Sequence, residues 1–214
     1  MNNLAETLRA QGDLNRVREL HEKVLEVSRR ILGEEHPNTL ASMNNLAETL
    51  WAQGDLNGAR GLQKKALEIS RRILGEEHPE TLASMYNLAN TLWAQGDLNR
   101  ARELHEKVLE IRRRILGEEH PNTLASMNNL ANALSAQGDL NRARELREKV
   151  LEISRRVLGE EHPDTLRSMN NLAESLSAQG DLNRAGSSKK RCWKSGGAFW
   201  EKSTPTHPTP SGTC

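Results

Sequence analysis

The chain has 214 residues, and its 30 basic residues nearly balance its 29 acidic ones, which leaves a formal net charge of +1. So small a charge gives no electrostatic reason to expect a nucleic acid or a membrane surface as the partner. No run approaches the ~18 consecutive apolar residues of a transmembrane helix, and no basic-then-apolar start indicates a secretory signal. Both cysteines, Cys192 and Cys214, lie near the end of the sequence, so we expect no disulfide framework and a cytoplasmic protein.

The dominant pattern is a tandem repeat with a period of about 42 residues, a size typical of helical repeat arrays. It predicts units near residues 1–36, 37–78, 79–120, 121–162 and 163–185, the first and last incomplete, followed by a disordered tail at 186–214. The repeated strings are QGDLN, which begins at Gln11, Gln53, Gln95, Gln137 and Gln179, and GEEHP, which begins at Gly33, Gly75, Gly117 and Gly159.

In chain order, each unit first predicts a helix with one apolar stripe. In the second unit the apolar residues of this stripe recur at helical spacing. Gly54 then supplies the left-handed residue that ends the helix, and Asp55 can cap the next one. The stripe consists of Leu40, Met43, Leu46, Ala47 and Leu50.

A second helix with a broader apolar stripe follows in each unit. Gly75 ends it, and Pro79 suits the first turn of the next helix, where its missing N–H group costs nothing. Ala47 and Ala59 are small residues at the expected crossing point of the two helices. One helical pair cannot bury both of its faces, so neighbouring pairs stack into a curved, all-α array. The second stripe consists of Leu56, Ala59, Leu62, Ala66, Leu67, Ile69, Ile73 and Leu74.

The segment Asn44–Ile69, NNLAETLWAQGDLNGARGLQKKALEI, resembles the tetratricopeptide repeat. The usual unit of that family has about 34 residues, and the longer form found here resembles the repeats of kinesin light chains and related scaffold proteins. The resemblance extends from residue 1 to about residue 185. It implies a right-handed α-α superhelix that binds other proteins, but not a motor subunit, because a heptad-rich segment is absent.

The resemblance also implies that the first helices line a concave groove. Asparagine side chains there would pair with a peptide backbone of any sequence, since each amide both donates and accepts hydrogen bonds. Tryptophans would add apolar anchors. The alternative is that some of these asparagines bond only to neighbouring helices. The implied binding residues are Asn44, Asn45 and Trp51, then Tyr86, Asn87, Asn90 and Trp93, then Asn128, Asn129 and Asn132, and finally Asn171, with Glu48, Ser135, Asn170, Glu174 and Ser177 at equivalent positions.

Other polar residues carry weaker indications of chemistry. One histidine per connection, each followed by proline, invites a metal site, but a zinc site needs about four converging ligands, so we interpret His36, His78, His120 and His162 as turn or cap residues. His21 and His105 have no partner four residues away, and we assign them no role. Adjacent glutamates in an exposed turn do not suggest acid–base catalysis. We therefore expect no catalytic residue, no metal ion and no cofactor. Pairs spaced for surface ion pairing are Glu19–Lys23, Glu68–Arg72, Glu103–Lys107 and Glu145–Lys149.

The repeat stops abruptly after Ala185, and the composition changes. If Ala198–Thr206 is encoded by suitable codons, a shifted reading frame gives Val-Leu-Gly-Glu-Glu-His-Pro-Asp, the sequence of Val157–Asp164, one repeat further along the chain. This favours a tail that is repeat DNA read out of frame, over a basic targeting signal at Lys189–Arg191. Without its second helix the last repeat would expose apolar side chains, which predicts fraying or self-association.

Among functions, the pattern favours an interaction scaffold that binds a peptide or partner protein in the groove. The alternative is a truncated fragment of a larger multidomain signalling or regulatory protein with no independent function. A helical array that binds RNA would need a basic face that reads bases, and the neutral, asparagine-rich groove does not fit it. An enzyme is the least favoured class, because no catalytic motif occurs.

Overall fold

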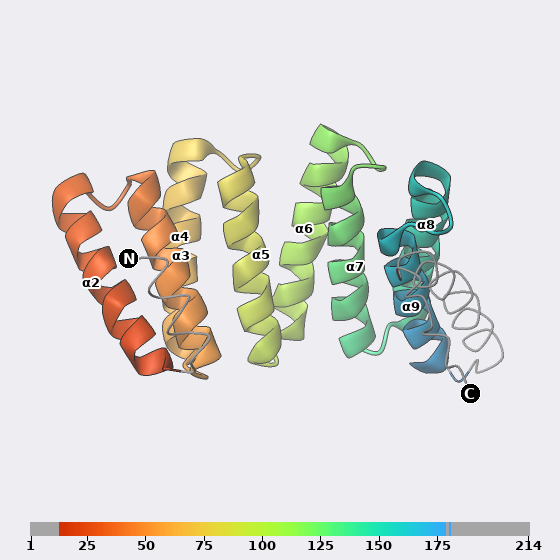
Figure 1. Ribbon diagram of the computed structural model, residues 1–214, viewed down its shortest axis with the longest axis horizontal. Helices are drawn as coiled ribbons and strands as arrows, with labels where there is room; N and C mark the ends of the chain where they lie inside the picture. Colours follow the sequence, from red (N-terminus) through yellow and green to blue (C-terminus); the bar gives the residue numbers. More distant parts are fainter. Residues whose placement is uncertain (1–12, 179, 181–214) are drawn as a thin grey trace, which may run out of the picture. The chain divides into compact units, whose positions relative to one another are not determined.

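The computed structural model describes residues 13–178 and residue 180 of the chain. All regular structure in this part is α-helical (Figure 1), as the sequence predicts. Helices of 19 residues alternate with helices of 16 residues, in step with the repeat. The helices are α2 (Leu14–Leu32), α3 (Pro37–Ala52), α4 (Leu56–Leu74), α5 (Pro79–Ala94), α6 (Leu98–Leu116), α7 (Pro121–Ala136), α8 (Leu140–Leu158) and α9 (Pro163–Ala178).

The short turn between α3 and α4 follows the sequence prediction. Gly54 has a φ of 84°, a conformation that side-chain-bearing residues rarely adopt. The backbone N–H of Asp55 donates to the carbonyl oxygen of Leu50 over 2.8 Å. The carboxylate of Asp55 then accepts from the N–H of Gly58 over 2.9 Å, which caps α4. The predicted roles of Gly54 and Asp55 are confirmed.

The longer connection from α4 to α5 explains the GEEHPxT string. Gly75 has φ 84° and ψ 171°, a region that is essentially restricted to glycine. His78 Nδ1 accepts the N–H of Glu80 over 3.2 Å, and Pro79 occupies the first turn of α5. Thr81 Oγ1 donates to the carbonyl oxygen of Gly75 over 2.8 Å and so closes the turn. The prediction that the repeated histidines are cap residues is confirmed at His36, His78, His120 and His162.

The chain divides into two compact parts, an N-terminal part of residues 1–115 and a C-terminal part of residues 116–214. In the N-terminal part consecutive helices pack side by side around buried methionine and leucine residues. Ala47 and Ala59, the small residues that the sequence predicts at the helix crossing, are completely buried in one core cluster. A second cluster joins α5 to α6 through residues such as Met85 and Val108. In the C-terminal part, Leu151 of α8 packs with Met169, Leu172 and Leu176 of α9.

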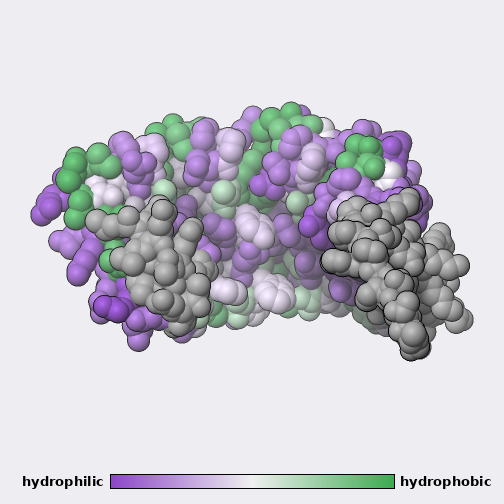
Figure 2. Space-filling view, in the orientation of Figure 1, coloured by the Kyte–Doolittle hydropathy of each residue, from purple (hydrophilic) through white to green (hydrophobic). Residues whose placement is uncertain are grey.

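One predicted core residue is not in the core. Ile73 continues the apolar stripe of α4, but 43% of its surface is exposed, whereas Ile69 one turn earlier is buried. The reason is length, because α4 has 19 residues and its neighbours α3 and α5 have 16. The last turn therefore has no helix to pack against. Figure 2 shows hydrophobic patches on an otherwise largely hydrophilic face.

The predicted ion pairs within helices are also wrong in detail. Lys107 pairs with Glu76 over 2.6 Å and Lys149 with Glu118 over 2.7 Å, instead of with the glutamates four residues before them. Arg72 likewise pairs with Glu35 over 2.5 Å. The glutamates of the first three GEEHP turns thus reach the second helix of the following repeat. Such exposed pairs each stabilise little, but the same contact between turn and helix recurs in successive repeats. The recurring pairs also include Lys65–Glu34, Arg114–Glu77 and Arg156–Glu119.

Several predictions concern residues outside the described ones. These are the interpretation of the tail at 186–214, the fate of the last repeat's missing helix, and the self-association expected from it. The division into units near 1–36, 37–78, 79–120, 121–162 and 163–185 also stays a prediction. In the described part, no helix is both long and apolar enough to cross a membrane.

Candidate binding groove

Residues of helices α3, α4 and α5 in the N-terminal part line an open cavity of about 330 Å³. Five of the predicted binding residues line it, contributed by the first helices of two successive repeats. Gln63 of α4 and Thr91 of α5 complete the lining together with Glu48. The predicted residues that the structure brings together here are Asn44, Asn45, Trp51, Asn87 and Asn90.

Three polar atoms of this cavity are buried and have no hydrogen-bond partner in the protein. They are Asn44 Oδ1, Gln63 Oε1 and Thr91 Oγ1. Gln63 is only 5% exposed and Thr91 only 1% exposed. A buried polar group without a partner costs about 1–3 kcal/mol. The cavity therefore presents hydrogen-bonding capacity that the protein itself does not use.

Gln63 belongs to a set of residues that the sequence reasoning missed. The second helices of successive repeats carry His21, Gln63, His105 and Arg147 at the same repeat position. We call these the floor positions, because they reach from the second helix to the first helices. One sequence signal could have identified the floor positions: a polar residue on the buried side of the helix, whose type changes from repeat to repeat while most other positions stay the same. The last three are buried, with 5–7% of their surface exposed.

The two tryptophans differ in their surroundings. Both are about half exposed, Trp51 at 46% and Trp93 at 50%. Trp51 forms part of the cavity wall, whereas Trp93 is not among the residues that line it. Tyr86 is also absent from the lining. Its ring instead meets that of His105 edge to face, with 5.9 Å between the ring centroids.

The histidines on the second helices have contacts that correct the sequence interpretation. His21 Nδ1 lies 2.9 Å from Thr49 Oγ1 of α3, within hydrogen-bonding distance. His105 is 5% exposed and packs against Tyr86. Burial favours the neutral imidazole and lowers the pKa of His105 to about 4. Both partners lie on other helices, so a search four residues along the same helix could not find them.

The lowered pKa of His105 predicts that stability depends on pH. The unfolded chain binds a proton near the ordinary pKa of 6.5, whereas the folded chain resists it down to about 4. The free energy of unfolding therefore falls as the pH drops from 6.5 towards 4, with a slope of at most about 1.4 kcal/mol per pH unit from this residue. His105→Gln, which adopts the residue of position 63, should flatten that part of the curve. Urea unfolding of both proteins at several pH values measures the difference, and identical slopes would contradict the assignment.

In the C-terminal part the floor position holds an arginine. Arg147 Nη1 donates to the carbonyl oxygen of Asn171 over 2.7 Å and to Ser175 Oγ over 2.6 Å. Its Nη2 donates to Asn132 Oδ1 over 2.6 Å. Burial lowers the pKa of Arg147, and the nearby charge of Glu174 opposes that shift. The guanidinium is thus held mainly by neutral oxygen atoms.

The predicted asparagines of the C-terminal part partly bond to the protein itself. Asn132 accepts from Arg147, and Asn171 Nδ2 donates to Asn128 Oδ1 over 3.5 Å. Asn129 is half-buried on α7. For Asn132 and Asn128, the alternative of bonding to neighbouring helices therefore holds in the structure.

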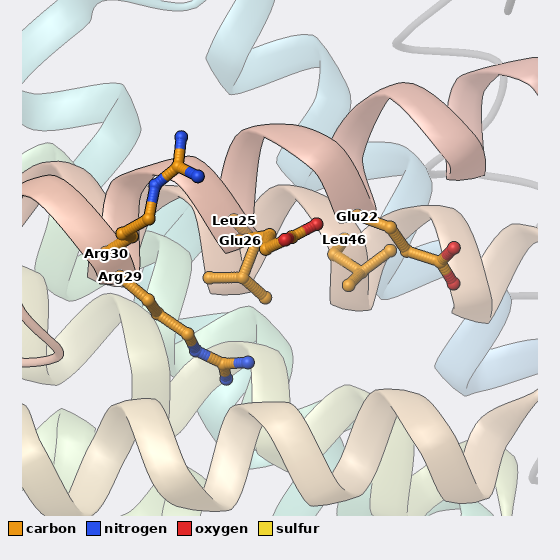
Figure 3. Close-up of a pocket in the computed structure, with 6 residues that line it drawn as sticks. All are labelled: Glu22, Leu25, Glu26, Arg29, Arg30 and Leu46. Carbon is orange, nitrogen blue, oxygen red and sulfur yellow. The ribbon is translucent and has the colours of Figure 1, made fainter.

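A second kind of depression lies between α2 and α3 and measures about 500 Å³. In Figure 3, Leu25 and Leu46 lie together at its centre, with Glu22 on one side and Arg29 and Arg30 on the other. A depression of about 530 Å³ recurs one repeat later at the equivalent residues. Because this depression recurs at equivalent residues of the repeat, we do not assign a specific binding site to it. Among the described residues, no group of His, Cys, Asp and Glu side chains could hold a metal ion.

The tetratricopeptide repeat family matches the chain over residues 1–67, 42–114, 82–146 and 128–188. The chain belongs to the tetratricopeptide repeat family. This confirms the resemblance that residues 44–69 suggest, and such repeats typically mediate protein–protein interaction. None of the curated proteins matches the chain in sequence.

Solved tetratricopeptide repeat structures agree with this assignment. A crystal structure of nearly identical TPR-like repeats from a candidate kinesin light chain of Podosopora anserina is 34% identical, with a TM-score of 0.84 over 92% of this chain and 93% of that one. BtubC (BKLC) from P. vanneervenii is 22% identical, with a TM-score of 0.82 over 99% of this chain and 83% of that one. A Rap protein complexed with competence and sporulation factor is 15% identical, with a TM-score of 0.68 over 92% of this chain and 53% of that one. The last two show likeness of fold alone.

Proposed function

We propose that this chain is a protein-interaction scaffold that binds an extended peptide or partner segment along its first helices. The observation that carries the proposal is the cavity between α3, α4 and α5, where the amides of two successive repeats gather beside a half-exposed tryptophan. Packing between the helices alone does not require such a polar lining. Buried oxygen atoms without a protein partner support the same conclusion.

The chemistry of the lining suits an extended segment. Asn45, Asn87 and Asn90 each offer an amide that can donate to a peptide carbonyl group or accept from a peptide N–H group. Such pairing depends on the backbone of the ligand and tolerates many sequences. Trp51 adds an exposed aromatic surface, of the type that provides a large share of interface free energy. Asn129, half-buried on α7, is the corresponding candidate in the C-terminal part.

A double substitution tests the proposal. Peptides are selected from a displayed random library on the full chain, and the affinity of the best peptide is measured for each variant. Asn45→Ala together with Asn87→Ala should weaken binding about tenfold or more, because each lost hydrogen bond contributes about 0.5–1.5 kcal/mol. Adding Asn129→Ala extends the test to the C-terminal part.

The control is Glu110→Ala, which changes an exposed residue of α6 away from the cavity lining. Its affinity for the peptide should equal that of the unchanged chain. Far-UV circular dichroism must show the same helicity for all variants. Unchanged affinity of the folded double variant would refute the assignment of the groove.

A further inference from the structure

We propose that the cavity between α3, α4 and α5 is a subsite for the guanidinium group of an arginine side chain carried by the partner. This inference rests on the proposed function and names the side chain that the groove selects. It follows from three independent features of the N-terminal part and from a comparison with the C-terminal part of the same chain.

The first feature is the excess of hydrogen-bond acceptors. Asn44 Oδ1 and Gln63 Oε1 are amide oxygens, which can only accept, and both are buried without a protein donor. Thr91 Oγ1, also without a partner, can accept as well. A ligand that satisfies them must bring several donors into a small space. A guanidinium group carries five N–H donors in one plane and no acceptor.

The second and third features are charge and aromatic surface. Glu48 is the charged side chain among those that line the cavity, so the lining carries negative charge. Trp51 offers an aromatic wall that is 46% exposed. A guanidinium pairs with carboxylates, stacks on aromatic rings and is more weakly hydrated than an ammonium group. A cavity of about 330 Å³ is at the small end of ligand sites, which suits one side chain.

The C-terminal part already holds a guanidinium in the equivalent place. Arg147 occupies the repeat position of Gln63, and it donates to Asn132 and Ser175. Two repeats earlier, the positions of Asn132 and Ser175 are those of Glu48 and Thr91, and both of these line the cavity. Equivalent positions therefore bind the chain's own arginine in one part. In the other part, the shorter Gln63 leaves that place for an arginine from the partner.

The test uses the full, ¹⁵N-labelled chain and short peptides as probes. Ac-Gly-Arg-Gly-NH₂ is titrated while the indole N–H signal of Trp51 is followed by NMR, that signal being assigned by Trp51→Ser. The titration is repeated with a peptide that carries citrulline in place of arginine, because the citrulline side chain has a similar shape but no charge. We expect saturable, weak binding, on the order of millimolar for one side chain, with arginine at least about fivefold tighter than citrulline.

Two variants borrow residues from other repeats of the chain. Gln63→Arg places the residue of position 147 in the floor and should abolish the arginine-dependent shift by filling the subsite from within. Glu48→Asn introduces the residue found at the equivalent positions 90 and 132 and should weaken arginine binding severalfold while leaving citrulline unchanged. Glu110→Ala, which changes an exposed residue of α6 outside the lining, is the control and should bind as the unchanged chain does.

The proposal is overturned if citrulline binds as well as arginine, or if the folded Gln63→Arg variant still responds to arginine. It is also overturned if the probe does not shift the Trp51 signal at all. In that case, library peptides whose affinity depends on Asn45 and Asn87 would show that the groove functions without an arginine subsite. If the affinity of the library peptides does not depend on Asn45 and Asn87 either, the proposed function is refuted together with the arginine subsite.

Discussion

Met85→Ala is expected to lower the free energy of unfolding by about 2–5 kcal/mol, the range for truncating a buried methionine to alanine. Met85 is 0% exposed and lies in the cluster that joins α5 to α6 and to Leu67 of α4. Its cluster therefore unites three helices of two successive repeats. Because repeat arrays are stabilised by contacts between neighbours, the loss affects the interface as well as one helix.

Urea unfolding followed by circular dichroism measures this effect. The control is Glu110→Ala, which changes an exposed residue of α6. Surface substitutions of this kind usually change stability by less than about 0.5 kcal/mol. A Met85→Ala variant as stable as Glu110→Ala would show that the cluster is not the core that the structure describes.

The second large effect concerns the buried guanidinium of Arg147. Ser175→Ala removes an acceptor that lies 2.6 Å from Arg147 Nη1 and is itself 3% exposed. A buried charged donor that loses its partner costs about 1.5–3 kcal/mol, and we expect a destabilisation of that size. This destabilisation arises from the positive charge of Arg147, so Ser175→Ala should cost less when position 147 is uncharged.

A double-mutant cycle separates this reason from a simple loss of packing. In the Arg147→Gln background, which adopts the residue of position 63, Ser175→Ala should cost less than about 1 kcal/mol. The difference between the two backgrounds measures the coupling between Arg147 and Ser175. Equal costs in both backgrounds would contradict the account of a charge held by neutral oxygen atoms.

Much of the fold could be predicted from the sequence, because the same helix and turn signals occur in each repeat. Periodic leucines, Gly54 and Asp55 define the helices and their short turn, and each prediction rests on local chemistry. Thr81 is different, because its position recurs in successive repeats but its bond to Gly75 crosses the turn, and the apolar periodicity of the helices does not predict that bond. The exposure of Ile73 likewise depends on where neighbouring helices end, which a stripe along one helix does not show.

The sequence predicted the lining residues on the first helices, but it did not predict the floor positions on the second helices. Asn45, Asn87 and Trp51, which the family resemblance implies as binding residues, line one cavity. Gln63 and Arg147 were missed because the floor position makes its contacts with other helices, as Arg147 of α8 does with Ser175 of α9. The ion pairs were misassigned for the same reason, since lysines of the second helices meet glutamates of the preceding repeat's turn.

Site-directed photo-crosslinking tests whether a partner segment lies along the first helices. A photoreactive amino acid is placed at Asn90, which lines the cavity, or at Glu110, an exposed position of α6. Each protein is irradiated with a peptide selected on the unchanged chain. We expect a crosslink at position 90 and none at position 110. A crosslink at position 110 alone would show that the partner binds elsewhere and would contradict the proposed groove.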